Sequence, residues 1–302
     1  MDRRNFIKSS LGAGIALGSF SGAGSLQSLY AGEAPPHLVA VKGGEPAAMF
    51  DKAIEAAGGI KKFVKKNQKV VVKPNIGWDV SPERAGNTNP DLVRRIIEQC
   101  YWAGAKEVYV FDNPCDNMQK CYKNSGIERA VKDAGGKMVS GTSDSYYQDV
   151  TIKGMKKMKD AKVHELILES DVFINVPVLK HHSSAKVTIA MKNLMGIVSD
   201  RRYWHRNDLH QCIAEFATWR KPTLNIVDAY RVMKKNGPRG VSKEDVVIMN
   251  SLLLSTDMVA IDAAATKLFG LEPDSIPYIK IASELGVGRK DLDKLNIKRI
   301  KI

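Results

Sequence analysis

Short apolar runs alternate with helix-like segments along most of the chain. Runs rich in Val, Ile and Leu predict strands over residues 37–41, 69–75, 107–112, 137–140, 171–178, 223–227, 246–254 and 296–302. Apolar positions three and four residues apart predict helices over residues 45–57, 90–103, 127–134, 209–219, 258–269 and 275–285. Because strands that alternate with helices imply right-handed crossovers, we expect an α/β fold with a mostly parallel or mixed sheet and helices on both faces.

No internal repeat and no low-complexity linker divides residues 32–302, which predicts one compact domain. The hydrophobic alternation is weaker between about residues 143 and 165, and this stretch is expected to be a small insertion. Residues 163–170 fit either a helix or a strand. Asn89 and Asp257 stand at the positions of N-caps for the helices that follow them.

Several apolar runs end abruptly in polar side chains. These end residues are Lys73, Asn75, Asp112, Lys180, His181, His182 and Asp228. The carboxyl ends of parallel strands lie at one edge of a sheet, and ligands of open α/β sheets bind in the crevice outside that edge. The sequence therefore predicts that these residues converge on a ligand site, although polar residues at strand ends also serve as turns and caps.

Residues 171–210 contain the densest group of chemically capable side chains. The buried-strand pattern of residues 171–178 is followed by Lys180 and two histidines, and a helix is predicted to end near Met195, before Gly196. Further polar residues in and after that helix are Lys186, Lys192, Asn193, His205 and His210.

Lysine and asparagine side chains dominate this predicted site. Lys73, Lys180 and Lys192, together with Asn75 and Asn193, can hold a phosphate or carboxylate group by charge-assisted hydrogen bonds. Asp112 and Asp228 are further candidates for ligand binding.

Two kinds of catalytic group are also present. His181 or His205 can act as a general acid or base, and Lys180 joins them as a candidate catalytic residue.

A divalent metal is an alternative occupant of the site. Neutral imidazole suits Zn, Fe or Ni, so His181, His205 and His210 can form a metal site with Asp112 or Asp228. The spacing of these residues matches no fixed metal motif. The motifs G-x-S-x-G, G-x-G-x-x-G and G-x-x-x-x-G-K-[ST] are absent, which argues against serine-hydrolase, dinucleotide-binding and P-loop readings.

Cysteine spacing excludes two common cofactors. Cys100, Cys115, Cys121 and Cys212 form no C-x-x-C or C-x-x-C-H, so neither a ferredoxin-type iron–sulfur cluster nor a c-type haem is expected. Cys115 and Cys121 lie in one predicted loop and can pair in an oxidising compartment.

The first 31 residues resemble a twin-arginine export signal. Arg3 and Arg4 precede Phe6, Ile7 and Lys8, and a mild apolar run follows over residues 11–23. This run is too short to span a bilayer, which needs roughly 20 residues, so no stable membrane span is expected. The resemblance implies a periplasmic or otherwise exported protein that engages the twin-arginine machinery and is exported folded, often with a cofactor.

The chain is strongly basic, with a net charge of +13. Removing residues 1–31, which carry three basic side chains and one acidic one, leaves +11. A nucleic-acid partner is not expected outside the cytoplasm. The charge therefore indicates an anionic small molecule, an acidic partner protein or association with an anionic surface, unless it is only a lysine-rich surface.

Four segments form one further pattern: K-P-N at residues 73–75, N-x-P-x-x-K-x-H at residues 175–182, K-N-x-x-G at residues 192–196, and the later His205. Together they resemble the bacterial and archaeal family called domain of unknown function 362. His181 and His182 can each hold the histidine position of the second segment. Family members fused to iron–sulfur modules imply redox or anaerobic metabolism, but this chain contains no such module.

Two functions follow from these observations. The first is an exported enzyme or redox protein that binds an anionic small molecule, or a metal-dependent cofactor, at the carboxyl edge of the sheet. The alternative is a non-catalytic accessory or binding protein that serves a redox partner.

Overall fold

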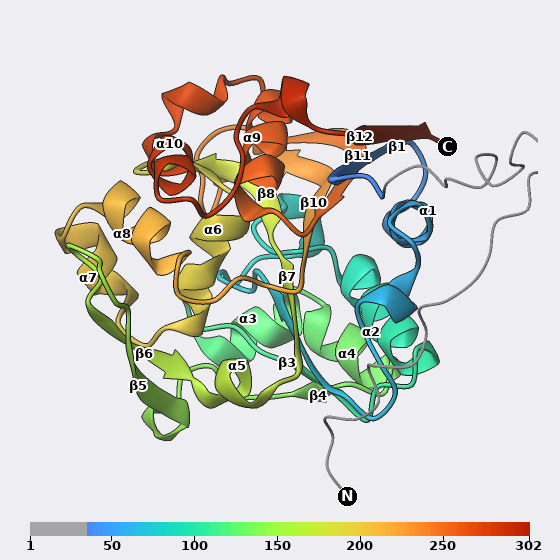
Figure 1. The fold of residues 1–302 in the computed structure, drawn as a ribbon. Helices are drawn as coiled ribbons and strands as arrows, with labels where there is room; N and C mark the ends of the chain where they lie inside the picture. The colour runs from blue at the N-terminus through green and yellow to red at the C-terminus, as the bar shows by residue number, and fades with distance from the viewer. Residues whose placement is uncertain (1–34) are drawn as a thin grey trace, which may run out of the picture. The chain divides into compact units, whose positions relative to one another are not determined.

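The strands of the central sheet follow the order β12-β1-β11-β10-β7-β2-β3-β4 in the computed structural model, which describes residues 35–302 (Figure 1). Their bounds are Ile297–Lys301, Leu38–Lys42, Val246–Ser255, Leu224–Met233, Val172–Val176, Lys69–Pro74, Glu107–Val110 and Lys137–Met138. All neighbours from β10 to β4 are parallel, as are β1 and β12, whereas β11 is antiparallel to both of its neighbours. The predicted α/β fold with a mostly parallel or mixed sheet is confirmed.

Helices cover both faces of this sheet (Figure 1). On one face lie α1 (Pro46–Ala56), α2 (Pro90–Trp102) and α4 (Ile127–Asp133). The other face packs against α5 (Glu165–Glu169), α6 (Ala190–Asn193), α8 (Leu209–Phe216), α9 (Met258–Phe269) and α10 (Pro277–Glu284).

Strand β2 shows why both faces must be covered. Val70 and Val72 pack into the core beneath α1 and α2, whereas Val71, on the opposite side of the pleat, packs into the other core. All three side chains are fully buried, as expected for a parallel strand with helices on both sides.

Two predicted helix caps are confirmed. The Asn89 side chain accepts a hydrogen bond from the Asp91 N–H, and Asp257 accepts bonds from the N–H groups of Val259 and Ala260. Each satisfies donors that the first turn of a helix leaves unpaired.

The predicted strand over residues 171–178 is interrupted at Pro177, which has no N–H to donate. The chain continues as β8 (Val178–His182), which pairs with β10, and returns as β9 (Lys186–Thr188). The prediction of a helix that carries Lys186 is therefore wrong: Lys186 lies in β9, and α6 begins only at Ala190.

Residues 163–170 contain both of the alternatives that the sequence left open, since β6 (Asp160–His164) leads directly into α5. β5 (Tyr147–Thr151) pairs antiparallel with β6 in a separate two-stranded sheet, at the position of the expected insertion. Two short helices, α3 (Met118–Asn124) and α7 (Arg201–Arg206), were not predicted from the sequence.

Within residues 35–302, no helix is long and apolar enough to cross a membrane. The predicted export signal, residues 1–31, lies outside the described residues.

Candidate functional site

A pocket of about 310 Å³ opens where β2, β3 and β8 end and where α6 leads into a 3-10 turn over Leu194–Ile197. Seven of the ten predicted site residues line it: Lys73, Asn75, Asp112, Lys180, Lys192, Asn193 and His205. Three do not line it: His181, His210 and Asp228.

Lys73 forms a buried ion pair with Asp112 across adjacent strands. Its Nζ lies 2.9 Å from the Asp112 Oδ1, and both side chains are almost completely buried. The same Nζ donates to the carbonyl oxygen and to the Oδ1 of Asn193, each at 2.8 Å. Burial lowers the pKa of Lys73, while the nearby Asp112 opposes that change.

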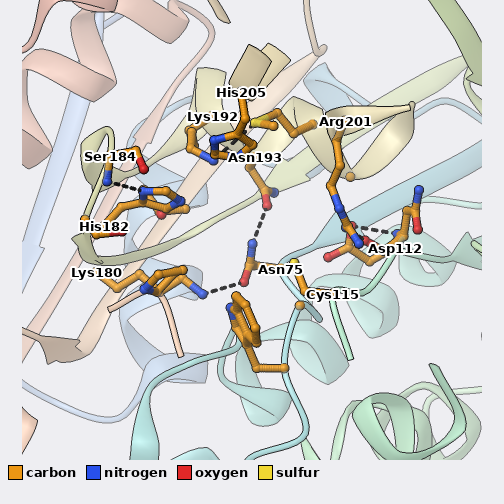
Figure 2. A pocket seen from close by; sticks show the side chains of 18 of the residues that line it. Asn75, Asp112, Cys115, Lys180, His182, Ser184, Lys192, Asn193, Arg201 and His205 are labelled. Atoms are coloured by element: carbon orange, nitrogen blue, oxygen red, sulfur yellow. Dashed lines mark hydrogen bonds between the residues drawn. The ribbon is translucent and has the colours of Figure 1, made fainter. Parts of the chain in front are cut away.

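Asn75 joins this pair to Lys180. Its Nδ2 donates to the Asn193 Oδ1 at 3.0 Å, and its Oδ1 accepts from the Lys180 Nζ at 2.9 Å, as Figure 2 shows. Lys180 also donates to the carbonyl of Gly86. The end of β2, the end of β8 and the turn of α6 are thereby linked by one continuous network.

Asn175 extends the network into the sheet. Its Oδ1 accepts from the Asn193 Nδ2 at 2.9 Å, and its Nδ2 donates to the Asn225 Oδ1 and the Ala190 carbonyl, both at 3.0 Å. Every one of these amides is buried, so each needs its partners. Asn75, Asn175, Lys180 and Asn193, which all belong to the motif segments identified in the sequence, therefore form one hydrogen-bonded framework.

Gly196 fits against the ion pair because it has no side chain. A Cβ at this position would lie 1.8 Å from the Asp112 Oδ1 and 2.5 Å from the Lys73 Nζ. The final glycine of the K-N-x-x-G segment thus allows the 3-10 turn to approach the charged groups of β2 and β3.

The charges of the pocket do not balance. Among the described lining residues, one carboxylate, Asp112, faces five cationic side chains: Lys73, Lys180, Lys192, Arg201 and Arg202. Asp112 is already occupied by Lys73 and by the N–H groups of Ile76 and Asn113. The pocket therefore has an excess of positive charge.

Lys192 has the weakest partner of the buried lysines. Its Nζ donates only to the Met195 Sδ, at 3.1 Å, within the described part of the chain, and thioether sulfur is a weak acceptor. Burial lowers the pKa of Lys192 to about 8 and that of Lys180 to about 7. An anion in the pocket would offset this cost of burying positive charge.

The structure places His182, rather than His181, in the pocket. Lys180 and His182 lie two residues apart on β8 and face the same side, whereas His181 faces the other. The His181 Nδ1 accepts from the Gly237 N–H at 3.0 Å and so positions the loop after β10. His182 accepts from the Ser184 and Ala185 N–H groups, and burial lowers its pKa well below the usual range.

The predicted metal triad is not assembled. His205 stacks against His182 with ring centroids 6.1 Å apart, but His210 packs on Tyr278 at 5.9 Å, outside the pocket. No group of three or more His, Cys, Asp and Glu side chains within residues 35–302 is arranged to hold a metal ion. The histidines diverge because strand alternation and helix packing direct them to different sides.

Asp228 supports the backbone instead of lining the pocket. Its carboxylate accepts from the Asn89 N–H at 2.7 Å and from the Tyr230 N–H at 3.1 Å. Burial raises the pKa of Asp228 to about 6. This is the turn and cap role that polar strand-end residues also serve.

Several lining residues were not predicted from the sequence, among them Trp78, Thr188 and Arg201. Arg201 begins α7, and its guanidinium donates to the carbonyls of Asn113 and Pro114. Cys115 lines the pocket and is exposed, whereas Cys121 is buried, and all four cysteines are free. The Arg-Arg pair at residues 201–202 was the available signal, because it lies between the K-N-x-x-G segment and His205.

One known protein resembles this chain in sequence, and another resembles it in structure. A thylakoid-associated protein of Synechocystis is 27% identical over 254 residues, which cover 81% of this chain and 76% of that protein. The lactate racemase apoprotein of Thermoanaerobacterium thermosaccharolyticum is 12% identical with a TM-score of 0.46, covering 73% of this chain. The chain spans 54% of that racemase structure, and nothing about ligand or reaction follows from so distant a likeness.

Comparison of the chain with known protein families finds the same family that the four motif segments resemble. Its match extends over residues 70–267, well over half of the chain, and contains all four segments. The chain belongs to the domain of unknown function 362 family (DUF362).

Proposed function

We propose that this protein binds a small molecule carrying a phosphate or carboxylate group in the pocket at the carboxyl edge of the sheet. The observation that carries the proposal is Lys192, a buried ammonium group that faces the pocket and whose only hydrogen-bond partner within residues 35–302 is a thioether. The Thr188 hydroxyl, also in the pocket, is buried without a hydrogen-bond partner among the described residues. A bound oxyanion supplies acceptors for both groups.

Lys180 gives the pocket a group that can move a proton. With a pKa of about 7, part of its population is a neutral amine at physiological pH, and its Nζ lies beside Asn75 at the pocket wall. His205, whose pKa burial also lowers, is the second candidate for proton transfer. In an enzyme, Lys192 and Arg201 would hold the anion while Lys180 or His205 exchanged a proton with it.

A non-catalytic carrier is the second candidate. Asp112 is fully engaged and His182 uses its Nδ1 to accept two backbone N–H groups, so neither is free to act as a base. In this version the pocket holds an anionic ligand and the basic surface docks on an acidic redox partner, in a complex that weakens with salt. A metal step is not part of either version, because the pocket surrounds its two histidines with lysine and arginine side chains.

Isothermal titration with inorganic phosphate and with malonate tests the binding site. Lys192→Met should weaken binding of the preferred anion by about 10- to 100-fold, the range for losing one hydrogen bond to a charged group. The same variant should not lower thermal stability without ligand, because it removes a buried charge that has no carboxylate partner in the described part of the chain.

Lys123→Met is the matched control, since Lys123 is exposed on α3 and lies outside the pocket. It should leave affinity unchanged. Equal affinity in wild type and Lys192→Met, with both proteins folded, would disprove the anion site.

A further inference from the structure

A second cavity, of about 500 Å³, lies between helix α9 and the sheet end formed by β11, β1 and β12. We call it the alkyl groove; its main lining residues are Leu38, Ala40, Lys42, Leu253, Ala264, Lys267, Leu268, Leu292, Ile297, Arg299 and Lys301. None of these residues lines the anion pocket described above.

The register of the three strands arranges the floor of the groove in rows. Leu38 pairs with Ile297, Ala40 lies between Leu253 and Arg299, and Lys42 lies between Ser251 and Lys301. Because residues i, i+2 and i+4 of a strand share one face, these rows succeed one another along the groove. The floor therefore changes from purely apolar at one end to doubly cationic at the other.

Small side chains create the space above this floor. Ala40 on the sheet and Ala264 on α9 both line the groove, where larger residues would fill it. Leu268 and Leu292 add apolar walls that remain partly exposed to solvent. An open apolar groove of this kind is unfavourable in water until a ligand covers it.

The cationic end has little to neutralise it. Three of the cationic residues, Lys42, Arg299 and Lys301, are exposed and form no ion pair within residues 35–302. The fourth, Lys267, forms a long ion pair, with its Nζ 3.8 Å from the Glu272 Oε2. An anionic group at this end would thus meet several positive charges at once, next to a continuous apolar surface.

We propose that the alkyl groove binds a single-chain amphiphilic anion, an unbranched alkyl carboxylate. The alkyl chain lies over Leu38, Ile297 and Leu253, and the carboxylate lies between Lys42 and Lys301. The charge gradient along the floor fixes the direction in which the chain enters. The proposal does not depend on the anion pocket, because the two sites share no residue.

Calorimetric titration of the full chain with octanoate and dodecanoate, both below their micellar concentrations, tests this proposal. Each additional buried methylene should tighten binding about fourfold, so dodecanoate, with four more methylenes, should bind about 250-fold more tightly than octanoate. Dodecan-1-ol, with the same chain and no charge, should bind at least tenfold more weakly than dodecanoate. Equal affinity for the two carboxylates, or for the alcohol and the acid, would overturn the proposal.

Two kinds of variant locate the binding. Ala264→Phe fills the groove and should abolish dodecanoate binding, and Ala40→Leu does so from the sheet side if the first variant fails to fold. Lys42→Gln combined with Lys301→Gln should remove the preference for the acid over the alcohol.

Lys123→Met should bind dodecanoate as the wild type does, because Lys123 is exposed on α3 and lines neither cavity. Unchanged dodecanoate binding in a folded Ala264→Phe or Ala40→Leu variant would contradict the assignment. A ligand-free dimer that Ala264→Phe converts to monomer would also contradict it, because a second copy would then cover the groove.

Discussion

Lys180 is the residue whose charge responds most directly to pH near neutrality. Burial lowers its pKa to about 7, so the free pocket loses this positive charge as pH rises through 7. An anion binds the protonated form of Lys180. The affinity of the pocket for the anion is therefore highest below pH 7 and declines above it, by up to about tenfold per pH unit. Sulfate is a suitable probe, because its own charge is constant over this range.

We expect titrations of sulfate between pH 6 and pH 9 to show this decline. Lys180→Met should bind sulfate more weakly at pH 6 and should lack the decline that begins near pH 7. A later decline should remain in this variant, because Lys192 has a pKa of about 8. A wild-type affinity that stays constant from pH 6 to pH 9 would contradict the role of both lysines.

At the scale of single residues, the sequence predicted side-chain chemistry better than side-chain direction. Lys73, Asn75 and Lys180 were identified because each follows a buried apolar run, and all three reach the pocket. The choice between His181 and His182 depended on where β8 ends. Since β8 continues through His182, the alternation of the strand turns His181 away, and an apolar pattern that stops at Leu179 does not show this.

At the scale of elements, the turn that contains Gly196 decides whether the network can form. Gly196→Ala would place a methyl group 1.8 Å from the Asp112 Oδ1. Asp112 and its partner Lys73 are both buried and held by hydrogen bonds, so neither can move aside easily. We expect a loss of about 1–3 kcal/mol in the free energy of unfolding, the usual range for overpacking, together with weaker anion binding. Urea denaturation and sulfate titration measure the two effects.

Gly77→Ala is the control for this substitution, because Gly77 also lines the pocket but has room for a methyl group. Its Cβ would lie 3.6 Å from the Asn75 Oδ1, an ordinary van der Waals distance. This variant should lose less than about 1 kcal/mol. If Gly196→Ala proved as stable as Gly77→Ala, the close packing of the turn on the ion pair would be refuted.

Elements with strong periodicity were predicted well, and those decided by tertiary contacts were not. Val70, Val71 and Val72 form an uninterrupted apolar run, and α2 and α9 carry caps that the sequence shows directly. Residues 183–189 instead form a turn and β9, with Lys186 at a φ of +64°. That conformation depends on pairing with β8, a long-range choice that helix-like spacing in the local sequence does not reveal.

At the scale of the whole molecule, topology was the most informative prediction. Residues 73–75, 112, 180 and 192–193 lie far apart in the chain, yet a parallel sheet brings strand ends to one edge, where they line one pocket. The alkyl groove had no comparable signal. It depends on the pairing of β1 with β12, from opposite ends of the described chain, which no local pattern indicates.

The Arg3-Arg4 pair predicts where the protein acts. If residues 1–31 form a twin-arginine signal, Arg3→Lys combined with Arg4→Lys should reduce the exported fraction about tenfold or more, because that pathway recognises the paired guanidinium groups. Cell fractionation with a cytoplasmic marker measures this. Arg94→Lys with Arg129→Lys, two exchanges of the same type on exposed helix surfaces, should leave export unchanged. Equal export of the Arg3/Arg4 variant and the wild type would exclude this route. The Arg94/Arg129 variant should also keep the anion affinity of the wild type, because neither arginine lines the pocket.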